Sequence, residues 1–447
     1  MFSTNILGYK KGPANNIKLK ECSLDNDWKI INIPFDIPNK VAINNIKSFL
    51  TNISALEIPS SLMCNCNCIY CYIREKNLKN TYISVDSIKL ITEESQKNIF
   101  KYSKNNEKYI SSWGAEPLCN LNTLEYLIDF CIENNYYLNF STNGTIINKK
   151  VEELFYKLFS YYKNNNMKIQ TIQISLDGPK DIQDKYRPLY SNESNFENIS
   201  KFISFLDNLA EQLKINHSLY TFCSTIYLDE NCINTYKKSI DFYTNIENKK
   251  FYVPILPVRL ENSRNFTKID SEFFLQIIKE STEFLIEKSK RTGEAYLDFY
   301  AARIFLNSSR VDGWPRCSAM NTQIAIDIDG SLSMCHGPIT TSKLKPLLQF
   351  GNVLNKTIDY RKYISSIDAI YSDMNFRSIC KTCEIFQFSG PLCIACPPNG
   401  LSINEEPVNF NIHMCNIYKK CLPYWKLQYE NYSYLNRQKD LTLQERD

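Results

Sequence analysis

The sequence predicts an α/β fold, a partial barrel of six parallel strand-and-helix units followed by a cysteine-rich domain. The first observation is that six short, apolar, β-rich runs alternate with stretches of helical length between about residues 55 and 291. The second is that helical periodicity fades from about residue 311, where cysteines become frequent. Six units are too few for the closed eight-stranded barrel, so we expect an open one.

The expected strands lie at 55–61, 109–113, 137–141, 169–176, 219–228 and 251–258. The expected helices lie at about 85–104, 121–135, 149–165, 195–214, 231–247 and 271–291. In the second of these helices Leu124, Leu127, Ile128 and Cys131 recur at helical spacing. Strands that alternate with helices in this way favour a parallel sheet.

We divide the chain into four parts. Residues 1–54 form an N-terminal segment of unknown role, with one expected strand at 28–33. Residues 55–305 form the partial barrel, and residues 306–425 form the cysteine-rich domain. Residues 426–447 are a polar tail that we expect to be partly helical.

The composition limits the class of protein. The chain has 447 residues and a net charge of +4 without a dense basic stripe, which argues against a nucleic-acid partner. Residues 1–20 lack the apolar core of a secretory signal, and no run approaches 18 apolar residues. We therefore expect a cytoplasmic protein that does not cross a membrane. In that compartment its 17 cysteines favour metal or redox chemistry over disulfides.

Four cysteines within eight residues are the most informative motif. Cys64, Cys68 and Cys71 read as C-x3-C-x2-C and supply three thiolates. A closed zinc or iron–sulfur site needs four ligands, so a [4Fe–4S] cluster held here would keep one iron open for chemistry. The alternative is a partial zinc site or a set of buried thiols. Cys66, inside the motif, is interpreted as a bystander thiol, and five scattered cysteines elsewhere as small buried hydrophobes.

Unusual residues also follow the next expected strands, where α/β folds place their sites. Gly114-Ala-Glu-Pro117 follows the second strand, and small residues there permit close approach of the backbone. The polar tips at 141–144 and 175–178 follow the third and fourth strands and would suit ribose hydroxyls and a carboxylate. Arg187 carries a guanidinium suited to bidentate carboxylate binding. The alternative for each residue is ordinary turn and capping chemistry.

Together these motifs resemble those of the radical S-adenosylmethionine (SAM) enzymes. In that family the amino and carboxylate groups of SAM chelate the open iron, and reductive cleavage gives a 5′-deoxyadenosyl radical. Gly114–Pro117 looks like the family's G-G-E-P motif with Ala115 in place of a glycine, and Gln183 stands where histidine is common. The resemblance assigns SAM binding to Tyr70, Gly114, Ala115, Glu116, Pro117, Ser141, Asn143, Ser175 and Arg187.

The C-terminal cysteines form Cys317-x12-Gly330-x4-Cys335 and then Cys380-x2-Cys383-x9-Cys393-x2-Cys396-x18-Cys415-x5-Cys421. The second group alone is also compatible with a zinc ribbon. The whole set resembles the SPASM domain, which carries two auxiliary [4Fe–4S] clusters. The resemblance assigns one cluster to Cys380, Cys383, Cys393 and Cys415, and the other to Cys317, Cys335 and Cys396. Either Cys421 completes the second cluster or its open iron binds a substrate thiolate.

The resemblance therefore implies a maturase of a ribosomally made peptide, with thioether crosslinking as the expected reaction and carbon–carbon crosslinking and epimerisation as alternatives. We expect His336 to take a proton during catalysis, and the alternatives are a donor to a cluster sulfur and a solvent-exposed side chain. The expected partners are a precursor peptide and an electron donor such as a flavodoxin or ferredoxin. Two rival functions stay open. One is an anaerobic sulfatase-maturing enzyme that forms formylglycine, and the other is a zinc-binding or interaction protein without catalytic activity.

Overall fold

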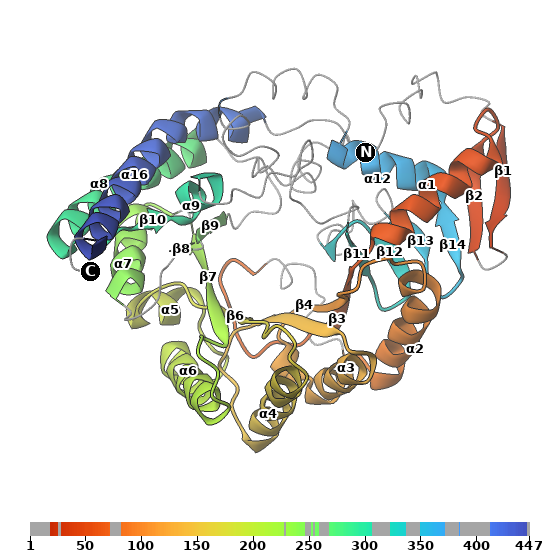
Figure 1. Ribbon diagram of the computed structural model, residues 1–447, viewed down its shortest axis with the longest axis horizontal. Coiled ribbons are helices and arrows are strands. Elements are labelled where there is room, and N and C mark those ends of the chain that lie inside the picture. The colour runs from red at the N-terminus through yellow and green to blue at the C-terminus, as the bar shows by residue number, and fades with distance from the viewer. Residues whose placement is uncertain are drawn as a thin grey trace.

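A computed structural model describes residues 18–25, 28–71, 82–227, 229–245, 252–253, 255–258, 268–305, 322–336, 349–371, 384 and 412–444. Its parallel strands follow one another along an arc, and the helices α2, α3, α4 and α6 cover the outer side of that arc (Figure 1). The arc is open, as expected for a partial barrel.

The six predicted strands are all present and stand side by side in sequence order, each parallel to the next. They are β3 (Ala55–Ser61), β4 (Tyr109–Gly114), β5 (Tyr137–Thr142), β6 (Ile172–Ser175), β7 (Tyr220–Tyr227) and β9 (Ile255–Val258). The parallel α/β fold predicted from the alternating pattern is confirmed.

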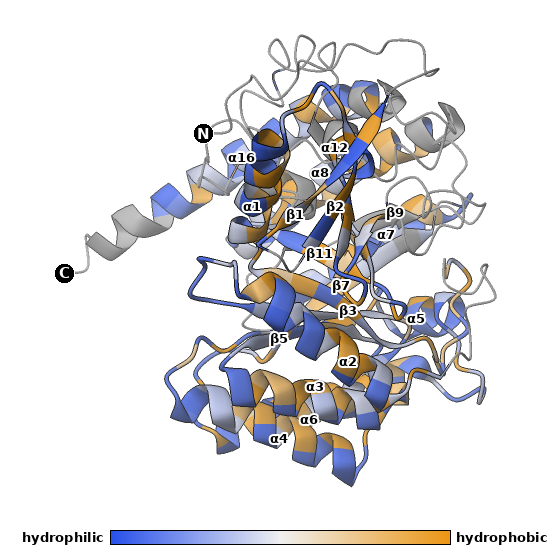
Figure 2. Ribbon diagram, turned by 90° about the vertical axis from the view of Figure 1, so that its right-hand side faces the viewer, coloured by the Kyte–Doolittle hydropathy of each residue, from blue (hydrophilic) through white to orange (hydrophobic). Residues whose placement is uncertain are grey.

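The predicted helices also form. They are α2 (Val85–Ser95), continued by the π-helical turn η3 (Gln96–Phe100), α3 (Leu121–Asn134), α4 (Lys149–Asn164), α6 (Asn195–Gln212), α7 (Cys232–Asn245) and α8 (Lys268–Thr292). A short helix, α5 (Lys180–Tyr186), lies before α6. Hydrophobic and hydrophilic bands alternate along α3 and α4 (Figure 2), as expected for helices with one buried face.

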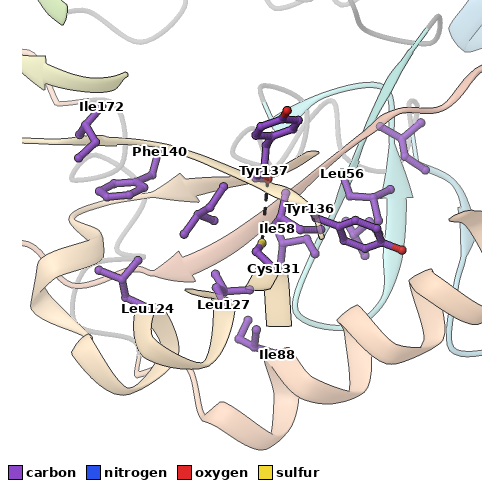
Figure 3. Close-up of a cluster of buried hydrophobic side chains, with 14 of the residues drawn as sticks. Leu56, Ile58, Ile88, Leu124, Leu127, Cys131, Tyr136, Tyr137, Phe140 and Ile172 are labelled. Carbon is purple, nitrogen blue, oxygen red and sulfur yellow. Dashed lines mark hydrogen bonds between the residues drawn. The ribbon is translucent and has the colours of Figure 1, made fainter. Parts of the chain in front are cut away.

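The core lies between the strands and these helices. Leu56 and Ile58 of β3 face Leu124, Leu127 and Cys131 of α3, and all five side chains are fully buried (Figure 3). Burying each large aliphatic side chain stabilises the fold by about 1.5–3 kcal/mol. Cys131 and Cys232 are fully buried, as predicted for small hydrophobes, whereas the other scattered cysteines are only partly buried.

The opposite face of the sheet is polar. Because successive side chains on a strand point to opposite faces, residues that alternate with the core positions line the inside of the arc. Glu57, Ser111 and Asn139 lie side by side on three neighbouring strands. Ser141, Gln173 and Thr221 continue this row and are exposed. The inside of the barrel is therefore a polar surface that solvent can reach.

The sheet extends beyond β3. Going outward, the added strands are β11 (Gln323–Ile326), β12 (Ser331–Ser333), β13 (Gln349–Asn352), β14 (Thr357–Asp359), β2 (Trp28–Pro34) and β1 (Leu19–Leu24). The predicted strand at 28–33 is β2, which pairs in parallel with β14. The N-terminal segment, with its helix α1 (Asn39–Asn52), thus shares one sheet with the cysteine-rich part of the chain. The boundaries of the four predicted parts stay predictions.

The far side of the barrel carries a second apolar cluster. Strands β8 (Tyr252–Val253) and β10 (Leu297–Asp298) form a small parallel sheet beside α9 (Phe299–Phe305). The long helix α16 (Ile412–Gln444) packs on α8, and the predicted helix in the polar tail is its last part. Helix α12 (Tyr360–Tyr371) follows β14 in the chain. Over the part of the chain that the structure describes, no helix is both long and apolar enough to span a membrane.

Candidate active site

The cysteine motif forms a loop at the carboxyl end of β3. This loop lies against the segment that follows α5, because Asn67 N–H donates to Pro188 O at 2.7 Å and Ile69 N–H to Tyr186 O at 3.1 Å. Cys66 forms an isolated antiparallel bridge with Leu189. The end of the first strand and the segment after the fourth are therefore joined directly at the loop that carries the thiols.

The thiols of this loop share one small cluster of side chains with Tyr70, Tyr186 and Leu189. Cys66 and Cys68 are buried, whereas Cys64 and Cys71 are partly buried. A hydrogen bond from the Cys66 thiol, together with the nearby Arg187 charge, outweighs burial and lowers the pKa of the Cys68 thiol to about 7. A metal ligand must be a thiolate, so this environment suits Cys68 as a ligand.

Within the described residues, no three His, Cys, Asp or Glu side chains converge closely enough to hold a single metal ion. A four-iron cluster differs from a single ion in that its ligand thiolates bind separate irons. The chemistry of the donor set, three thiols in one partly buried loop, fits such a cluster.

The turn after β4 supports the start of the cysteine loop. Gly114 has φ of +126°, and a Cβ there would lie 2.1 Å from Ser61 O, so only glycine fits. The next two backbone N–H groups, of Ala115 and Glu116, donate to Ser61 O at 2.8 Å and Met63 O at 2.9 Å. The close backbone approach predicted for this motif is present. Its two hydrogen bonds join the turn to the end of β3 and to the residue before Cys64.

The carboxylate of Glu116 links two of the predicted turns. It is buried and accepts hydrogen bonds from Leu118 N at 3.0 Å, from Thr142 Oγ1 at 2.7 Å and from Asn143 N at 2.6 Å. Burial raises its pKa to about 7 despite these three donors. Both carboxylate oxygens therefore already bind protein donors, and Pro117 next to it begins the short turn η4 (Pro117–Cys119).

The polar residues at the end of β5 and just after it divide between two surroundings. The amide of Asn143 donates to Asn65 Oδ1 at 2.8 Å and to Cys66 Sγ at 3.0 Å, so it faces the cysteine loop. Ser141 is exposed on the inner face of the sheet and donates to Gln173 Oε1 at 2.6 Å. The two residues therefore have different neighbours, and their assignment to SAM stays a prediction.

A buried polar triad lies behind the loop. Asp177 Oδ2 accepts from the Tyr70 hydroxyl and from Arg187 Nε at 2.9 Å, while its Oδ1 accepts from Thr225 N at 2.8 Å. The Arg187 guanidinium also lies over the Tyr70 ring, 5.2 Å from its centroid. Sequence reasoning named Tyr70 and Arg187 but missed Asp177, which it interpreted only as part of a turn.

Gln183 occupies the position where the family commonly has histidine. Its side chain is fully buried, accepts from Asp177 N at 2.7 Å, and donates to Asn195 Oδ1 at 2.7 Å and to Ser175 O at 3.3 Å. A neutral imidazole also accepts with one nitrogen and donates with the other. An amide therefore preserves the hydrogen bonding that this position requires.

His336 lies at the end of β12 on the inner side of the barrel. Its Nδ1 is 3.0 Å from Glu57 Oε1, its backbone N–H donates to Glu57 Oε2 at 2.8 Å, and its ring stacks on Trp113. Burial alone would lower the pKa of His336, but the hydrogen bond and charge of Glu57 raise it. Sequence reasoning missed Glu57, although a carboxylate within an apolar strand is a detectable signal.

Most predicted ligands of the auxiliary clusters fall outside the described residues, namely Cys317, Cys380, Cys383, Cys393 and Cys396. Cys415 lies within α16, and Cys335 is partly buried against the main core. Cys421, also on α16, is fully buried among apolar side chains, and burial raises the pKa of its thiol. The assignment of these residues to iron stays a prediction.

The sequence of this chain matches the model of a known protein family over part of its length. The model of the radical SAM superfamily matches residues 58–216, which include the cysteine loop, the Gly114 turn and the buried triad. Over these residues the chain is similar to the radical SAM superfamily, a family of enzymes that use SAM and a [4Fe–4S] cluster.

Two known enzymes are similar to this chain in sequence, and one solved structure is similar to it in fold. The chain is 27% identical to the radical SAM cyclopropyl synthase TigE of Paramaledivibacter caminithermalis, over 79% of this chain and 70% of that enzyme. It is 27% identical to a cysteine-type anaerobic sulfatase-maturating enzyme of Clostridium novyi, over 38% of this chain and 44% of that enzyme. The solved structure of anSMEcpe with bound AdoMet and a Cp18Cys peptide shares the fold, with a TM-score of 0.59, 16% identity, and coverage of 86% of this chain and 99% of that one.

Proposed function

We propose that this enzyme cleaves SAM reductively, abstracts a hydrogen from a peptide and crosslinks that peptide. The observation that carries the proposal is the position of the three-cysteine loop. It lies at the carboxyl end of β3, held by the Gly114 turn on one side and by residues 186–190 on the other. The radical SAM match covers the same residues.

In this proposal Cys64, Cys68 and Cys71 hold the [4Fe–4S] cluster. When bound, the cluster and SAM together supply a radical that removes a hydrogen atom from carbon. The chain's own part is to keep the loop in place and to exclude water. The burial of Cys68 and the packing of Tyr186 and Leu189 against the loop serve that part.

The buried triad orients the residues that we propose for SAM. Asp177 fixes the Arg187 guanidinium through Nε, so the other edge of its planar fork is the one that would meet a carboxylate. Asp177 also fixes the Tyr70 ring, which we assign to the adenine. The turns Gly114–Pro117 and the polar tips with Ser141, Asn143 and Ser175 complete the proposed SAM site.

A peptide substrate is supported by the relatives and by the inner face of the barrel. The anSMEcpe structure holds a peptide. In this chain Ser141, Gln173 and Thr221 line an exposed polar face that offers hydrogen-bonding groups to a peptide backbone. A precursor peptide is therefore our proposed partner.

The bond formed is a thioether or a carbon–carbon bond. An open iron in the second auxiliary cluster, if Cys421 does not complete it, would favour a thioether, whereas a cyclopropyl synthase among the relatives favours carbon–carbon bond formation. When either bond forms, the peptide loses two hydrogens, one as an atom and one as a proton. The remaining electron passes to an acceptor. Mass spectrometry after thiol alkylation separates them, because only the thioether removes a peptide thiol.

His336 is our proposed proton acceptor for that step. The Glu57 carboxylate holds both its backbone and Nδ1, which fixes the ring beside Trp113 on the inner face. The electron acceptor would be an auxiliary cluster held by the C-terminal cysteines, and a flavodoxin or ferredoxin would supply the initial electron. We also propose a cytoplasmic location, where thiols stay reduced.

The test is SAM cleavage by the anaerobically reconstituted chain with dithionite as reductant. We expect 5′-deoxyadenosine from the wild type and none from Cys68→Ala. Cys131→Ala is the matched control, because this thiol is buried behind the sheet in the α3 core. Equal product from Cys68→Ala and Cys131→Ala would contradict the proposed cluster site.

A second candidate function is sulfatase maturation. It is favoured by the similarity to the Clostridium novyi enzyme. It is weakened by His336, because the resemblance to sulfatase-maturing enzymes implies an aspartate at this place. Conversion of a short sulfatase-motif cysteine peptide to its formylglycine form would establish this function instead.

A further inference from the structure

The interior of the cysteine loop contains a sulfur that the cluster does not require. Cys66 stands between the proposed ligands Cys64 and Cys68, and its side chain is only 4% exposed. A bystander thiol would contact apolar neighbours. This thiol instead has polar partners on two sides.

Two side-chain amides from different loops donate to the Cys66 sulfur. Asn143 Nδ2, after β5, is 3.0 Å from it, and Asn195 Nδ2, at the start of α6, is 3.4 Å from it. Both asparagines are buried, with exposed fractions of 6% and 0%. Since a buried amide is costly to leave unsatisfied, these contacts hold the sulfur firmly in one place.

Both asparagines are themselves fixed. The Asn143 carbonyl accepts from Thr145 N at 3.0 Å and from Thr145 Oγ1 at 2.7 Å. Asn195 accepts from Gln183 at 2.7 Å and donates to Arg187 O at 2.7 Å. The amides therefore cannot turn away from the sulfur without breaking other buried hydrogen bonds.

The backbone N–H of Cys66 donates to Cys64 Sγ at 3.4 Å. The Asn143 amide also reaches Cys64 Sγ directly, at 3.8 Å. Two donors, the Cys66 N–H and the Asn143 amide, therefore point at the sulfur of one proposed ligand, and the amides that hold the Cys66 side chain keep this loop residue in place. Hydrogen bonds to the ligand sulfurs are one of the factors that set the reduction potential of an iron–sulfur cluster.

We propose that Cys66, held by Asn143 and Asn195, is a positioning residue that keeps these two donors aimed at the ligand thiolate of Cys64. This inference rests on the proposed cluster site and deepens it. Donors aimed at the ligand sulfurs stabilise the more negative, reduced cluster. Removing them makes the cluster harder to reduce.

The test is a redox titration of the reconstituted full-length enzyme, followed by the electron paramagnetic resonance signal that changes when SAM is added. That response singles out the cluster that binds SAM. The variants are Cys66→Ala, which removes the sulfur that accepts from the two amides, and Cys66→Ser, which keeps an oxygen that can accept from them. The matched control is Cys119→Ala, because this nearby half-buried thiol has only a weak contact with Asn65 at 4.0 Å.

At a fixed applied potential, we expect the ratio of reduced to oxidised cluster to be about tenfold lower in Cys66→Ala than in the wild type. For a one-electron couple this corresponds to a shift of about 59 mV toward more negative potential. Cys66→Ser should recover part of the shift, and Cys119→Ala should show none. Asn195→Ala, which removes one of the two amides, should shift the potential in the same direction.

Two results would overturn the proposal in different ways. A wild type with no SAM-responsive signal would overturn the proposed cluster site, and the role of Cys66 with it. A normal wild-type signal with equal potentials in Cys66→Ala and Cys119→Ala would overturn the role of Cys66 alone. A folded Cys66→Ala protein that assembles no SAM-responsive cluster would support it, because the ligands would then have lost their positions.

Discussion

Replacing Asp177 by alanine tests whether the buried triad holds the site together. The side chains of Arg187 and Asp177 are only 10% and 1% exposed. After the substitution the guanidinium, the Tyr70 hydroxyl and the Thr225 N–H all lose their common acceptor. A buried charge left without its partner costs about 3–5 kcal/mol.

The Tyr70 hydroxyl and the Thr225 N–H also lose their acceptor, but relaxation of the site and entry of water reduce the free-energy cost of these two neutral donors. We therefore expect the free energy of unfolding to fall by about 4 kcal/mol. The matched control is Asp181→Ala, four residues along the chain, whose 2.8 Å pair with Lys238 has both side chains more than half exposed, at 58% and 51%. An exposed pair contributes only about 0–1 kcal/mol.

The assay is urea unfolding of the full chain, followed by far-ultraviolet circular dichroism under anaerobic conditions. A double variant, Asp177→Ala with Arg187→Met, should be less destabilised than the sum of the two single variants, because it leaves no unpaired charge. If Asp177→Ala unfolds within about 1 kcal/mol of Asp181→Ala, the triad does not stabilise the site as argued here.

Three other substitutions give separate outcomes. Gly114→Ala should lose the cluster iron and melt at a lower temperature, because its Cβ would lie 2.1 Å from Ser61 O, and wild-type iron content would contradict this. Glu116 has a pKa raised by burial from 4.5 to about 7, so its stabilising contribution is complete below pH 4.5 and is lost as the pH rises through 7. The wild type should lose about 3 kcal/mol across that range, and Glu116→Gln should abolish this slope in unfolding measured at several pH values. Cys421→Ala should keep all its iron and melt slightly lower, because this thiol is fully buried in the apolar cluster of α8 and α16, and loss of four irons would instead make it a ligand.

The order of the barrel strands was predictable because each strand and helix carries its own local pattern. The strand around Ile174 is shorter than predicted, 172–175 instead of 169–176, although the predicted ends, Ile169 and Leu176, are apolar. The continuous sheet was not predictable. Strand β2 pairs with β14, more than 300 residues away, and nothing in either short segment specifies that partner.

The site was predictable where chemistry and spacing coincide, as in the cysteine loop and the Gly114 turn. It was not predictable where a side chain acts through partners distant in sequence. Asp177 sits in a turn where an acidic residue is ordinary, and its role depends on Arg187 and Thr225 approaching from other elements. The same holds for Asn195, whose contact with Cys66 joins residues that are 129 positions apart.

The most direct test of the proposed function is the iron and sulfide content of the anaerobically reconstituted chain, compared with a variant in which Cys64, Cys68 and Cys71 are all alanine. The proposal predicts about twelve irons in the wild type and about eight in the variant, the difference being the one cluster held by the loop. Equal iron in both proteins, or zinc in place of iron in the wild type, would contradict it.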